Sequence, residues 1–252
     1  MVGRILGAAV AAVIAVTTAN AAEAPRAPGQ EWSFDGIFGT YDRNALRRGL
    51  TVYTSVCGAC HSLDLVAYRH LGAVGYTEDE IKAIAAEFEV EDGPDEDGEM
   101  FSRAALPADA FAAPFPNEQA ARAANSGTYP PDLSLITKAR KHGADYLYAM
   151  LIEYRDEAPD GFELLDGMYY NEYFPGRQIA MPPPLFEDGV KYADGTKATV
   201  AQMAWDVTTF LAWAAEPEME ERKRLGIKVL IFVLVLTAML YALKRQIWSR
   251  LH

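Results

Sequence analysis

The chain has 252 residues, half of them apolar, so it can bury a substantial core and is not intrinsically disordered. Its formal net charge is −12, and residues 22–221 hold all 35 acidic residues but only 15 of the 23 basic ones. Because that acidic segment repels nucleic acid and attracts basic partners, the charge pattern argues for no nucleic-acid partner.

The first 21 residues have the pattern of a secretory signal peptide. Arg4 precedes an apolar run over residues 5–16, and Ala19-Asn20-Ala21 fits the small-x-small rule for cleavage. We expect the mature protein to begin near Ala22 and residues 22–221 to form an exported domain. An uncleaved N-terminal anchor is the alternative, because a single arginine makes a short basic region.

An amphipathic helix is predicted to lead into the most informative motif of the chain. Asp42 can cap this helix, and apolar side chains from Leu46 to Cys57 recur on one face. The helix runs into a C-x-x-C-H motif, Cys57 to His61, which is typical of c-type haem attachment. Two thiols about one helical turn apart can add to the vinyl groups of one porphyrin, while the next histidine ligates the iron.

A C-x-x-C pair also occurs in zinc sites and in redox-active dithiols. A zinc site needs a second Cys/His pair, yet His70, His142 and His252 stand at no recognisable ligand spacing. A thioredoxin-like dithiol follows a strand in a βαβ pattern, which is not visible here. In an exported, oxidising compartment two nearby thiols end as a disulfide unless something consumes them, so haem attachment is the favoured interpretation.

The sequence pattern over residues 77–131 predicts one short helix, which is followed by irregular chain. Thr77 and Glu80 can form a capping box for a helix that runs to about Phe88. Residues 87–99 carry eight acidic and no basic side chains, which predicts a mobile, solvated loop. That loop is either a hydrophilic connection or a docking surface for a cationic partner. The Ala- and Pro-rich stretch over residues 104–131 predicts a long irregular wrap.

A helix over residues 144–155 and an irregular aromatic stretch over residues 161–176 precede a second candidate ligand, Met181. An electron-transferring haem iron with histidine on one face needs another axial ligand, and a methionine thioether suits a high potential. Three prolines follow Met181 and would hold its sulfur at one distance, which favours it over the other methionines. The competing methionines are Met100, Met150, Met168, Met203 and Met219.

Two helices are predicted at the C-terminal end. Thr199 and Gln202 can form a capping box for a helix to Ala215, and a break is expected at Glu216-Pro217. The mostly apolar run over residues 225–243 is long enough to cross a bilayer, with basic and aromatic flanks. We expect a transmembrane anchor over residues 222–243, with a buried helix of a soluble protein as the alternative.

The whole chain resembles the cytochrome c1 family, the haem subunits of the ubiquinol:cytochrome c oxidoreductase (cytochrome bc1) complex. The resemblance covers nearly all of the mature chain, and several of its motifs are far more specific than C-x-x-C-H. They are Phe34-Asp35-Gly36-Ile37-Phe38-Gly39, Leu46-Arg47-Arg48-Gly49, Val56 to His61, Pro130-Pro131-Asp132-Leu133-Ser134, Asn171-Glu172-Tyr173-Phe174-Pro175-Gly176, Ala180-Met181-Pro182-Pro183-Pro184 and Phe210 to Pro217.

The resemblance implies one covalently attached haem c in an all-α fold. Cys57 and Cys60 would form the thioether bonds, and His61 and Met181 would be the axial ligands of the iron. The fold would be a class I cytochrome c-like haem domain with long irregular insertions and one C-terminal transmembrane helix. The subunit would need no catalytic acid, base or nucleophile of its own.

Three further residues receive roles from the resemblance. Arg140 would pair with a haem propionate, and Tyr146 is a weaker propionate candidate. Pro131 would place its carbonyl near the His61 imidazole, where it would fix the tautomer and the orientation of the ring.

The resemblance also implies a one-electron carrier of the respiratory chain. Electrons would come from a Rieske iron–sulfur protein and pass to a cytochrome c, with cytochrome b as a neighbouring subunit. The haem domain would lie on the periplasmic side of the bacterial inner membrane, and residues 244–252 would be cytoplasmic. Two alternatives stay open: another membrane-tethered monohaem c-type cytochrome, such as an oxidase subunit or electron feeder, and an exported dithiol or assembly protein without haem.

Overall fold

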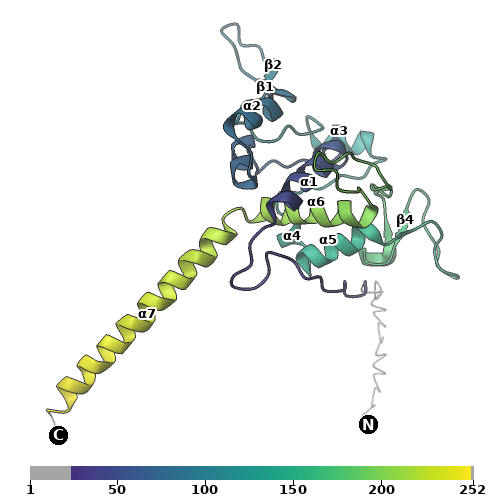
Figure 1. The fold of residues 1–252 in the computed structure, drawn as a ribbon. Coiled ribbons are helices and arrows are strands. Elements are labelled where there is room, and N and C mark those ends of the chain that lie inside the picture. Colours follow the sequence, from purple (N-terminus) through teal and green to yellow (C-terminus); the bar gives the residue numbers. More distant parts are fainter. Residues whose placement is uncertain (1–23, 251–252) are drawn as a thin grey trace, which may run out of the picture.

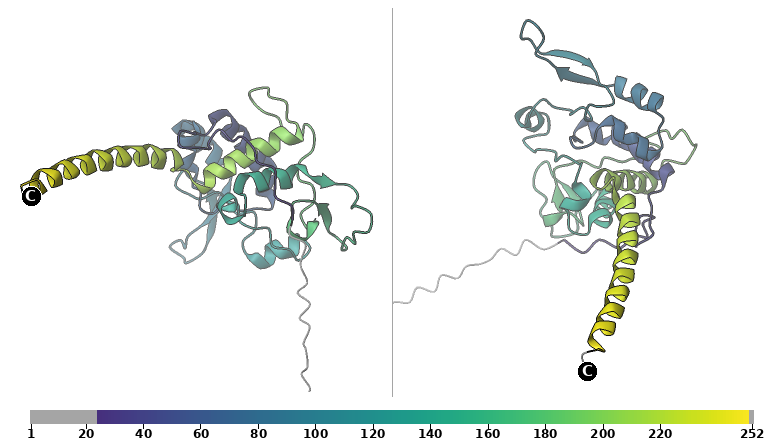
Figure 2. Two further views of the ribbon diagram at one scale, coloured as in Figure 1. Left: turned by 90° about the horizontal axis from the view of Figure 1, so that it is seen from below. Right: turned by 90° about the vertical axis from the view of Figure 1, so that its left-hand side faces the viewer.

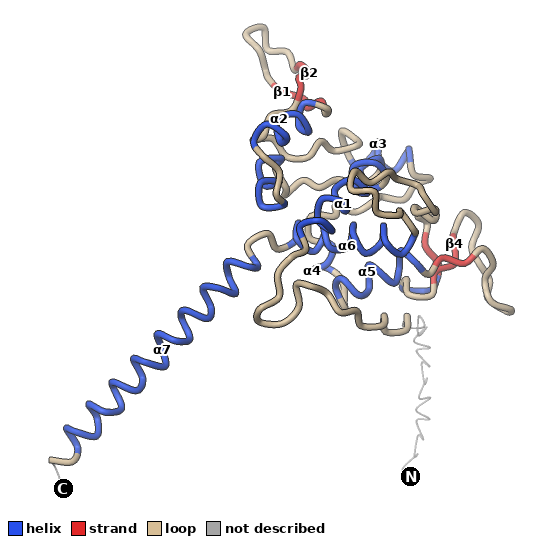
Figure 3. Tube along the Cα trace, viewed as in Figure 1, coloured by secondary structure: helices blue, strands red, loops and turns tan. Residues whose placement is uncertain are grey.

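Helices make up most of the regular structure in the computed structural model, which describes residues 24–250 (Figures 1 and 3). The helix-rich prediction is confirmed, whereas the signal peptide predicted for residues 1–21 lies outside the described residues. The α-helices are α1 (Arg43–Ser55), α2 (Glu78–Ala86), α3 (Glu118–Ala124), α4 (Ile136–Ala139), α5 (Gly143–Ile152), α6 (Val200–Ala215) and α7 (Met219–Trp248). The 3-10 turns are η1 (Cys57–Ala59), η2 (Tyr68–Val74) and η3 (Pro175–Arg177), and the strands are β1 (Glu89–Asp92), β2 (Phe101–Ala104), β3 (Tyr154–Arg155), β4 (Tyr169–Asn171) and β5 (Gln178–Ile179).

The crossing of α1 and α6 forms the centre of the core (Figure 2). Leu46 and Leu50 of α1 are buried, and Tyr53 packs against Phe210 of α6 with ring centroids 5.9 Å apart. Each large apolar side chain buried in this way stabilises the fold by about 1.5–3 kcal/mol. Both α4 and α5 also pack against α6, so α6 is the central helix on which the other elements rest.

Gly49 of α1 lets the two central helices approach each other closely. A Cβ atom at this position would lie 2.1 Å from the backbone oxygen of Asp206 and 2.6 Å from Cβ of Phe210. Both clashing atoms belong to α6, and the nearer is backbone that cannot rotate away. A side chain at position 49 must therefore push α1 and α6 apart.

Replacing Gly49 with alanine is expected to lower the free energy of unfolding by about 3 kcal/mol, the upper part of the usual range for overpacking. For a domain of this size, that loss lowers the melting temperature by roughly 6–12 °C. Thermal unfolding of the full chain in detergent measures the effect. Gly72→Ala is the matched control, because its Cβ would lie 3.9 Å from the nearest atom, Cδ1 of Ile81. Equal losses in both variants would contradict the close-approach account.

Capping residues set where the first helices begin, as the sequence predicts. The Asp42 carboxylate accepts hydrogen bonds from two backbone amides in the first turn of α1. At α2 the capping box is complete, because Thr77 N donates to Glu80 Oε2 at 2.7 Å and Glu80 N donates to Thr77 Oγ1 at 3.3 Å.

The capping box predicted for α6 is only half formed. Thr199 Oγ1 accepts a hydrogen bond from Gln202 N at 3.1 Å, as expected. The Gln202 side chain does not return to Thr199 but donates to the Asp206 carboxylate at 3.0 Å. Asp206 lies one helical turn further on, is fully buried and also pairs with Arg48, so the amide completes the hydrogen bonds of a buried charge.

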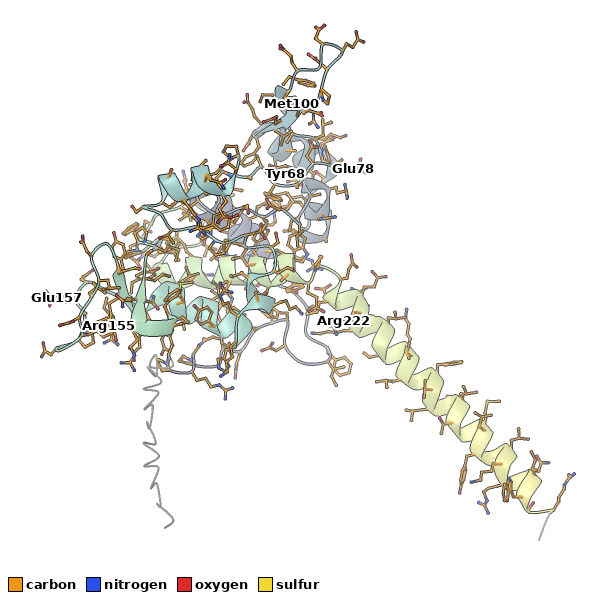
Figure 4. All side chains as sticks on the ribbon, turned by 180° about the vertical axis from the view of Figure 1, so that it is seen from behind. Tyr68, Glu78, Met100, Arg155, Glu157 and Arg222 are labelled. Carbon is orange, nitrogen blue, oxygen red and sulfur yellow. The ribbon has the colours of Figure 1, made fainter. Side chains whose placement is uncertain are left out.

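The acidic segment predicted as a loop forms the first strand and the turn of a β-hairpin, whose second strand follows the segment. Strand β1 pairs antiparallel with β2, so that Glu89 lies opposite Ala104. Arg103, just beyond the acidic run, forms ion pairs with Asp92 and, at 2.6 Å, with Asp109. These contacts offset the like-charge repulsion on which the loop prediction relied. The hairpin carries Met100, which is half-exposed, and projects from the body of the domain (Figure 4).

Short elements also occur in the two stretches predicted to be irregular. Helix α3 lies within residues 104–131, and β4 lies within residues 161–176. The helix predicted to reach Arg155 is α5, which ends at Ile152 because the next residues form β3 and pair with β4. Strand β4 also pairs with β5. The buried Asn171 of β4 donates to Met150 O at 2.7 Å and fastens this small sheet to α5.

Helix α7 leaves the domain after the predicted break at Glu216-Pro217 (Figure 1). It has 30 residues, about 45 Å at the rise of an α-helix, and contains the apolar run over residues 225–243. Mean hydropathy in its most apolar window is 2.4, and none of that window is buried inside the structure. The helix is therefore long and apolar enough to cross a membrane, and it is not the buried core helix held open as an alternative.

Candidate functional site

The C-x-x-C-H motif forms a tight turn directly after α1. The Cys57 carbonyl accepts hydrogen bonds from Cys60 N at 3.1 Å and from His61 N at 2.9 Å. One turn thereby gathers both thiols and the imidazole. Cys57 is half-buried, whereas Cys60 is exposed beside a cleft of about 220 Å³ whose lining includes Tyr129. The exposed thiol is therefore accessible for covalent attachment.

The His61 imidazole is oriented by a backbone carbonyl. Its Nδ1 lies 2.8 Å from Pro131 O, and because a carbonyl only accepts, Nδ1 carries the hydrogen. The other ring nitrogen, Nε2, then keeps a free lone pair for a metal. Burial lowers the pKa of His61, and the Pro131 contact opposes this shift only in part. The ring is thus held neutral, in the form that ligates iron.

Residues 131–134 are bound to the chain directly after His61. Leu133 N donates to Ser62 O at 2.9 Å, and the Asp132 carboxylate accepts from Ser62 Oγ and Asp64 N, both at 2.8 Å. Burial raises the pKa of Asp132, but its hydrogen bonds outweigh burial and hold that pKa below its usual range. The charged Asp132 therefore fixes the segment that positions the Pro131 carbonyl.

Two other interpretations of the cysteine pair receive no support from the structure. Burial raises the pKa of the Cys57 thiol to about 12, whereas a reactive dithiol needs a lowered thiol pKa. Within residues 24–250, no three His, Cys, Asp or Glu side chains gather in a way that could hold a metal ion. A zinc site at this turn is therefore disfavoured as well.

Met181 lies two residues after β5, and its side chain is partly buried against the hydrophobic core. Its backbone carbonyl accepts a hydrogen bond from Tyr154 Oη at 3.2 Å. Burial raises the pKa of Tyr154, so the hydroxyl keeps the proton that it donates. The small sheet before Met181, the Tyr154 contact and the three prolines after it together fix its backbone. Ligation of iron by the Met181 sulfur stays a prediction.

Arg140 directly follows α4, and Tyr146 lies in the first turns of α5. Burial raises the pKa of Tyr146, and the nearby charge of Arg140 lowers it to a smaller degree. Arg140 is exposed, whereas Tyr146 is half-buried, and Tyr146 is also a neighbour of Tyr154. A cation and a phenol are both groups that can receive an anionic carboxylate, which is the chemistry that a haem propionate presents. Their role at a propionate stays a prediction.

The donor set of the described residues fits a covalently attached haem. The turn at Cys57 supplies two thiols and a neutral imidazole, as thioether attachment and iron ligation require. The Nε atom of Arg177 is buried and has no hydrogen-bond partner within the described part of the chain. Buried charged groups are normally paired, so this nitrogen is a candidate partner for an anionic group that the protein itself does not supply.

Two residues of the site received no role in the sequence analysis. Asp132 belongs to a family motif and directly follows Pro131, which is the one sequence feature that could have indicated its role. Its contacts with the chain after His61 are seen in the structure. Tyr154 falls at the end of the helix predicted over residues 144–155. Its contact with Met181 depends on the pairing of β3, β4 and β5, for which the sequence carries no signal.

Comparison with known proteins gives extensive matches. The model of the Cytochrome C1 family matches residues 32–251. The chain is 52% identical over 249 residues to a mitochondrial cytochrome c1 heme protein of Solanum tuberosum, with 97% of this chain and 95% of that protein covered. It is 50% identical over 234 residues to cytochrome c1 of Rhodospirillum rubrum, with coverage of 87% and 86%. Against a cytochrome b/c1 of Bradyrhizobium diazoefficiens the identity is 47% over 246 residues, covering 89% of this chain but 36% of that protein.

The family match extends from the segment before α1 to the end of α7, so it includes every motif on which the resemblance rests. Proteins of this family carry a covalently bound haem c and transfer electrons within the cytochrome bc1 complex. Haem c is also the cofactor that the turn from Cys57 to His61 fits. The chain belongs to the cytochrome c1 family.

Proposed function

We propose that this protein accepts single electrons from a Rieske iron–sulfur protein and passes them to a cytochrome c, as the haem subunit of a cytochrome bc1 complex. The observation that carries the proposal is the contact between His61 Nδ1 and Pro131 O, at 2.8 Å. This contact leaves Nε2 ready to ligate iron on the same turn that holds both thiols. Family membership supports the placement in the bc1 complex.

In this proposal Cys57 and Cys60 would hold the porphyrin through thioether bonds, and His61 Nε2 and the Met181 sulfur would ligate its iron. Bound haem c supplies a one-electron couple between ferrous and ferric iron. The protein's task is to hold both axial ligands in place, so that electron transfer needs little rearrangement. No proton transfer or nucleophile is required of the chain.

The surrounding residues keep that geometry. Asp132, bound to the backbone and side chain after His61, holds the Pro131 carbonyl that orients the imidazole. Tyr154 performs the equivalent task for the Met181 backbone. Arg140, and more weakly Tyr146, would hold a propionate at the edge of the porphyrin. The negative charge of Asp132 and the hydroxyl proton of Tyr154 therefore keep the candidate ligands in position, although neither residue would touch the iron.

Helix α7 would anchor the protein in the bacterial inner membrane. Residues 222–243 would span the bilayer, with residues 22–221 in the periplasm and residues 244–252 in the cytoplasm. Three basic residues flank each end of the span, so the positive-inside rule does not set the orientation. The predicted export signal is what supports a periplasmic haem domain.

A purification from native membranes tests the proposal. A tag after the C-terminal residue should recover a dihaem cytochrome b and a Rieske protein together with this chain. Ubiquinol should then reduce the haem of this subunit, and added cytochrome c should reoxidise it. Recovery with oxidase subunits, or reduction that does not depend on the Rieske protein, would favour the alternative of another membrane-tethered monohaem cytochrome.

The negative charge of the domain predicts a salt-dependent reaction with a basic cytochrome c. The association rate should fall as ionic strength rises, since screening weakens electrostatic steering. If the acidic segment over residues 87–99 takes part, replacing its carboxylates with amides should lower the rate at low salt and flatten the salt dependence. Stopped-flow oxidation of the reduced protein measures this rate. A salt-independent rate would contradict electrostatic docking, and an unchanged rate in the amide variant would remove this segment from it.

A further inference from the structure

The loop over residues 34–40 exposes two large apolar side chains. Phe38 is 83% exposed and Ile37 is 67% exposed, although the neighbouring Phe34 and Tyr41 pack their rings against each other with centroids 5.2 Å apart. The loop is also closed tightly, because a Cβ atom at Gly39 would lie 2.0 Å from Asp35 O. Two adjacent, large apolar side chains that are exposed on one tightly closed loop are a candidate contact surface.

Both ends of this loop are fastened to the first turns of α7. The Lys223 ammonium donates to Phe34 O at 2.6 Å and to Gly39 O at 3.1 Å. These two hydrogen bonds of Lys223 hold the loop against the helix. The loop and the base of α7 therefore move as one unit.

A second set of contacts fixes α7 to the chain just after the loop. The Glu220 carboxylate accepts from Tyr41 N at 2.8 Å and from two nitrogens of Arg43 at 3.0 and 2.8 Å. Tyr41 Oη in turn donates to Ala212 O of α6 at 3.1 Å. The direction in which α7 leaves the domain is consequently set by the same segment that carries the exposed loop.

The loop lies level with the beginning of the apolar run of α7. Ile37 and Phe38 line a cleft of about 100 Å³ together with Arg224 and Ile227 of α7. In Figures 1 and 2 this segment lies beside the first turns of α7, on the side of the domain from which the helix departs. Arg224 is 72% exposed there, and Arg222, labelled in Figure 4, marks the same end of the helix.

We propose that the loop over residues 34–40 is a second membrane contact, which inserts Ile37 and Phe38 into the boundary between lipid headgroups and acyl chains. This inference rests on the proposed insertion of α7 in a bilayer. Aromatic and apolar side chains favour this boundary. Arg224, which is 72% exposed although it forms an ion pair with Glu220 at 3.5 Å, lies at the same level and can also contact lipid phosphates. Because the loop is fastened to α7 at Lys223, its insertion fixes the tilt of the haem domain above the membrane.

Lipid is the occupant that the surroundings of the loop favour. Ile37 and Phe38 line the same cleft as Ile227, which belongs to the apolar run of α7 that is proposed to enter the bilayer. The cation beside them is mostly exposed, as expected at a phosphate layer, whereas an interface core between proteins is depleted of charged residues.

Site-directed spin labelling tests the inference in the full holoprotein. The sequence has two cysteines, and in the proposed holoprotein both are bonded to haem, so an introduced cysteine is the one reactive thiol. Three variants are labelled with a nitroxide: Phe38→Cys, Phe186→Cys and Leu234→Cys. Phe186 is 66% exposed near the N-terminal end of α6, away from α7, and Leu234 lies within the apolar run of α7. Power-saturation measurements in phosphatidylcholine–phosphatidylglycerol vesicles compare collision with oxygen and with a water-soluble nickel chelate.

The label at position 38 should have an oxygen-to-nickel accessibility ratio several-fold above that at position 186 and below that at position 234. If position 38 matches position 186 while position 234 is in lipid, the loop is in water and the inference is overturned. If position 234 itself is in water, the anchoring by α7 fails and the inference fails with it. Loss of both collisions at position 38 in the purified complex would show that another subunit covers the loop, which also overturns the proposal.

Discussion

Replacing Met181 with leucine is expected to lower the midpoint potential of the haem by on the order of a hundred millivolts or more. The thioether is a soft, weak donor that favours ferrous iron, and axial ligands set haem potentials over a range of about 0.8 V. Leucine has a similar volume and keeps the packing against the core, so the fold should be preserved. The ferrous protein should also gain the ability to bind carbon monoxide, because one axial position becomes open. Redox titration and carbon monoxide difference spectra measure the two effects.

Met203→Leu is the matched control for this experiment. Met203 is fully buried on α6, so the same chemical change tests packing without touching the candidate ligand. We expect its midpoint potential to stay at the wild-type value. A wild-type potential in Met181→Leu, with a lowered one in a variant of Met100 or another methionine, would show that the sulfur on iron comes from elsewhere.

Replacing Arg48 with methionine is expected to lower the free energy of unfolding by about 3–5 kcal/mol. The side chain of Asp206 is 0% exposed, and Arg48 donates to its two oxygens at 2.9 and 3.0 Å. Without the guanidinium, the buried Asp206 carboxyl would be left in the core between α1 and α6 without its cation, and the Gln202 amide that still donates to it carries no charge. Thermal unfolding of the full chain, followed by circular dichroism, measures the loss.

The double variant Arg48→Met/Asp206→Leu distinguishes two contributions to stability. One is the destabilisation caused by an unpaired, buried Asp206, and the other is the net stabilisation by the Arg48–Asp206 ion pair. Removing both charged groups leaves no unpaired buried charge, and such exchanges are often neutral or stabilising. The double variant should therefore recover most of the stability that Arg48→Met loses. If both variants are equally destabilised, lost packing of the arginine side chain, rather than an uncompensated Asp206, accounts for the effect.

Sequence patterns predicted the parts of the fold that local interactions decide. The helical spacing after Asp42, the capping box at Thr77 and the apolar run of α7 each depend on residues within a few turns of one another. The turn at Cys57 is local in the same sense. These features agree with the structure because burial of a helical face and satisfaction of terminal amides are determined close along the chain.

The features that were missed depend on contacts between distant residues. The acidic hairpin forms with Arg103 bridging Asp92 and Asp109, a pairing that a count of acidic residues does not reveal. The Gln202 side chain turns toward Asp206, whose buried carboxylate is paired with Arg48 of another helix and accepts a further hydrogen bond. In each case a tertiary charge contact overrides the preference of a local segment.

The candidate site also combines features that adjacent residues determine with features that depend on distant residues. The residues of the C-x-x-C-H turn could be named from the sequence because adjacent positions carry the chemistry. The contact between His61 and Pro131 was anticipated only through family resemblance, since 70 positions separate the two residues. The supporting roles of Asp132 and Tyr154 emerged from the fold, because each acts through a backbone carbonyl rather than through the cofactor itself.

A pyridine haemochrome spectrum of the purified protein tests whether haem is covalently attached to this chain. The spectrum should show one haem per chain with both vinyl groups saturated, and haem stain should stay with the polypeptide in denaturing electrophoresis. Cys57→Ser/Cys60→Ser should lose the stain at the position of the protein. Haem that separates from the wild-type chain on denaturation, or a purified protein without haem, would contradict the account.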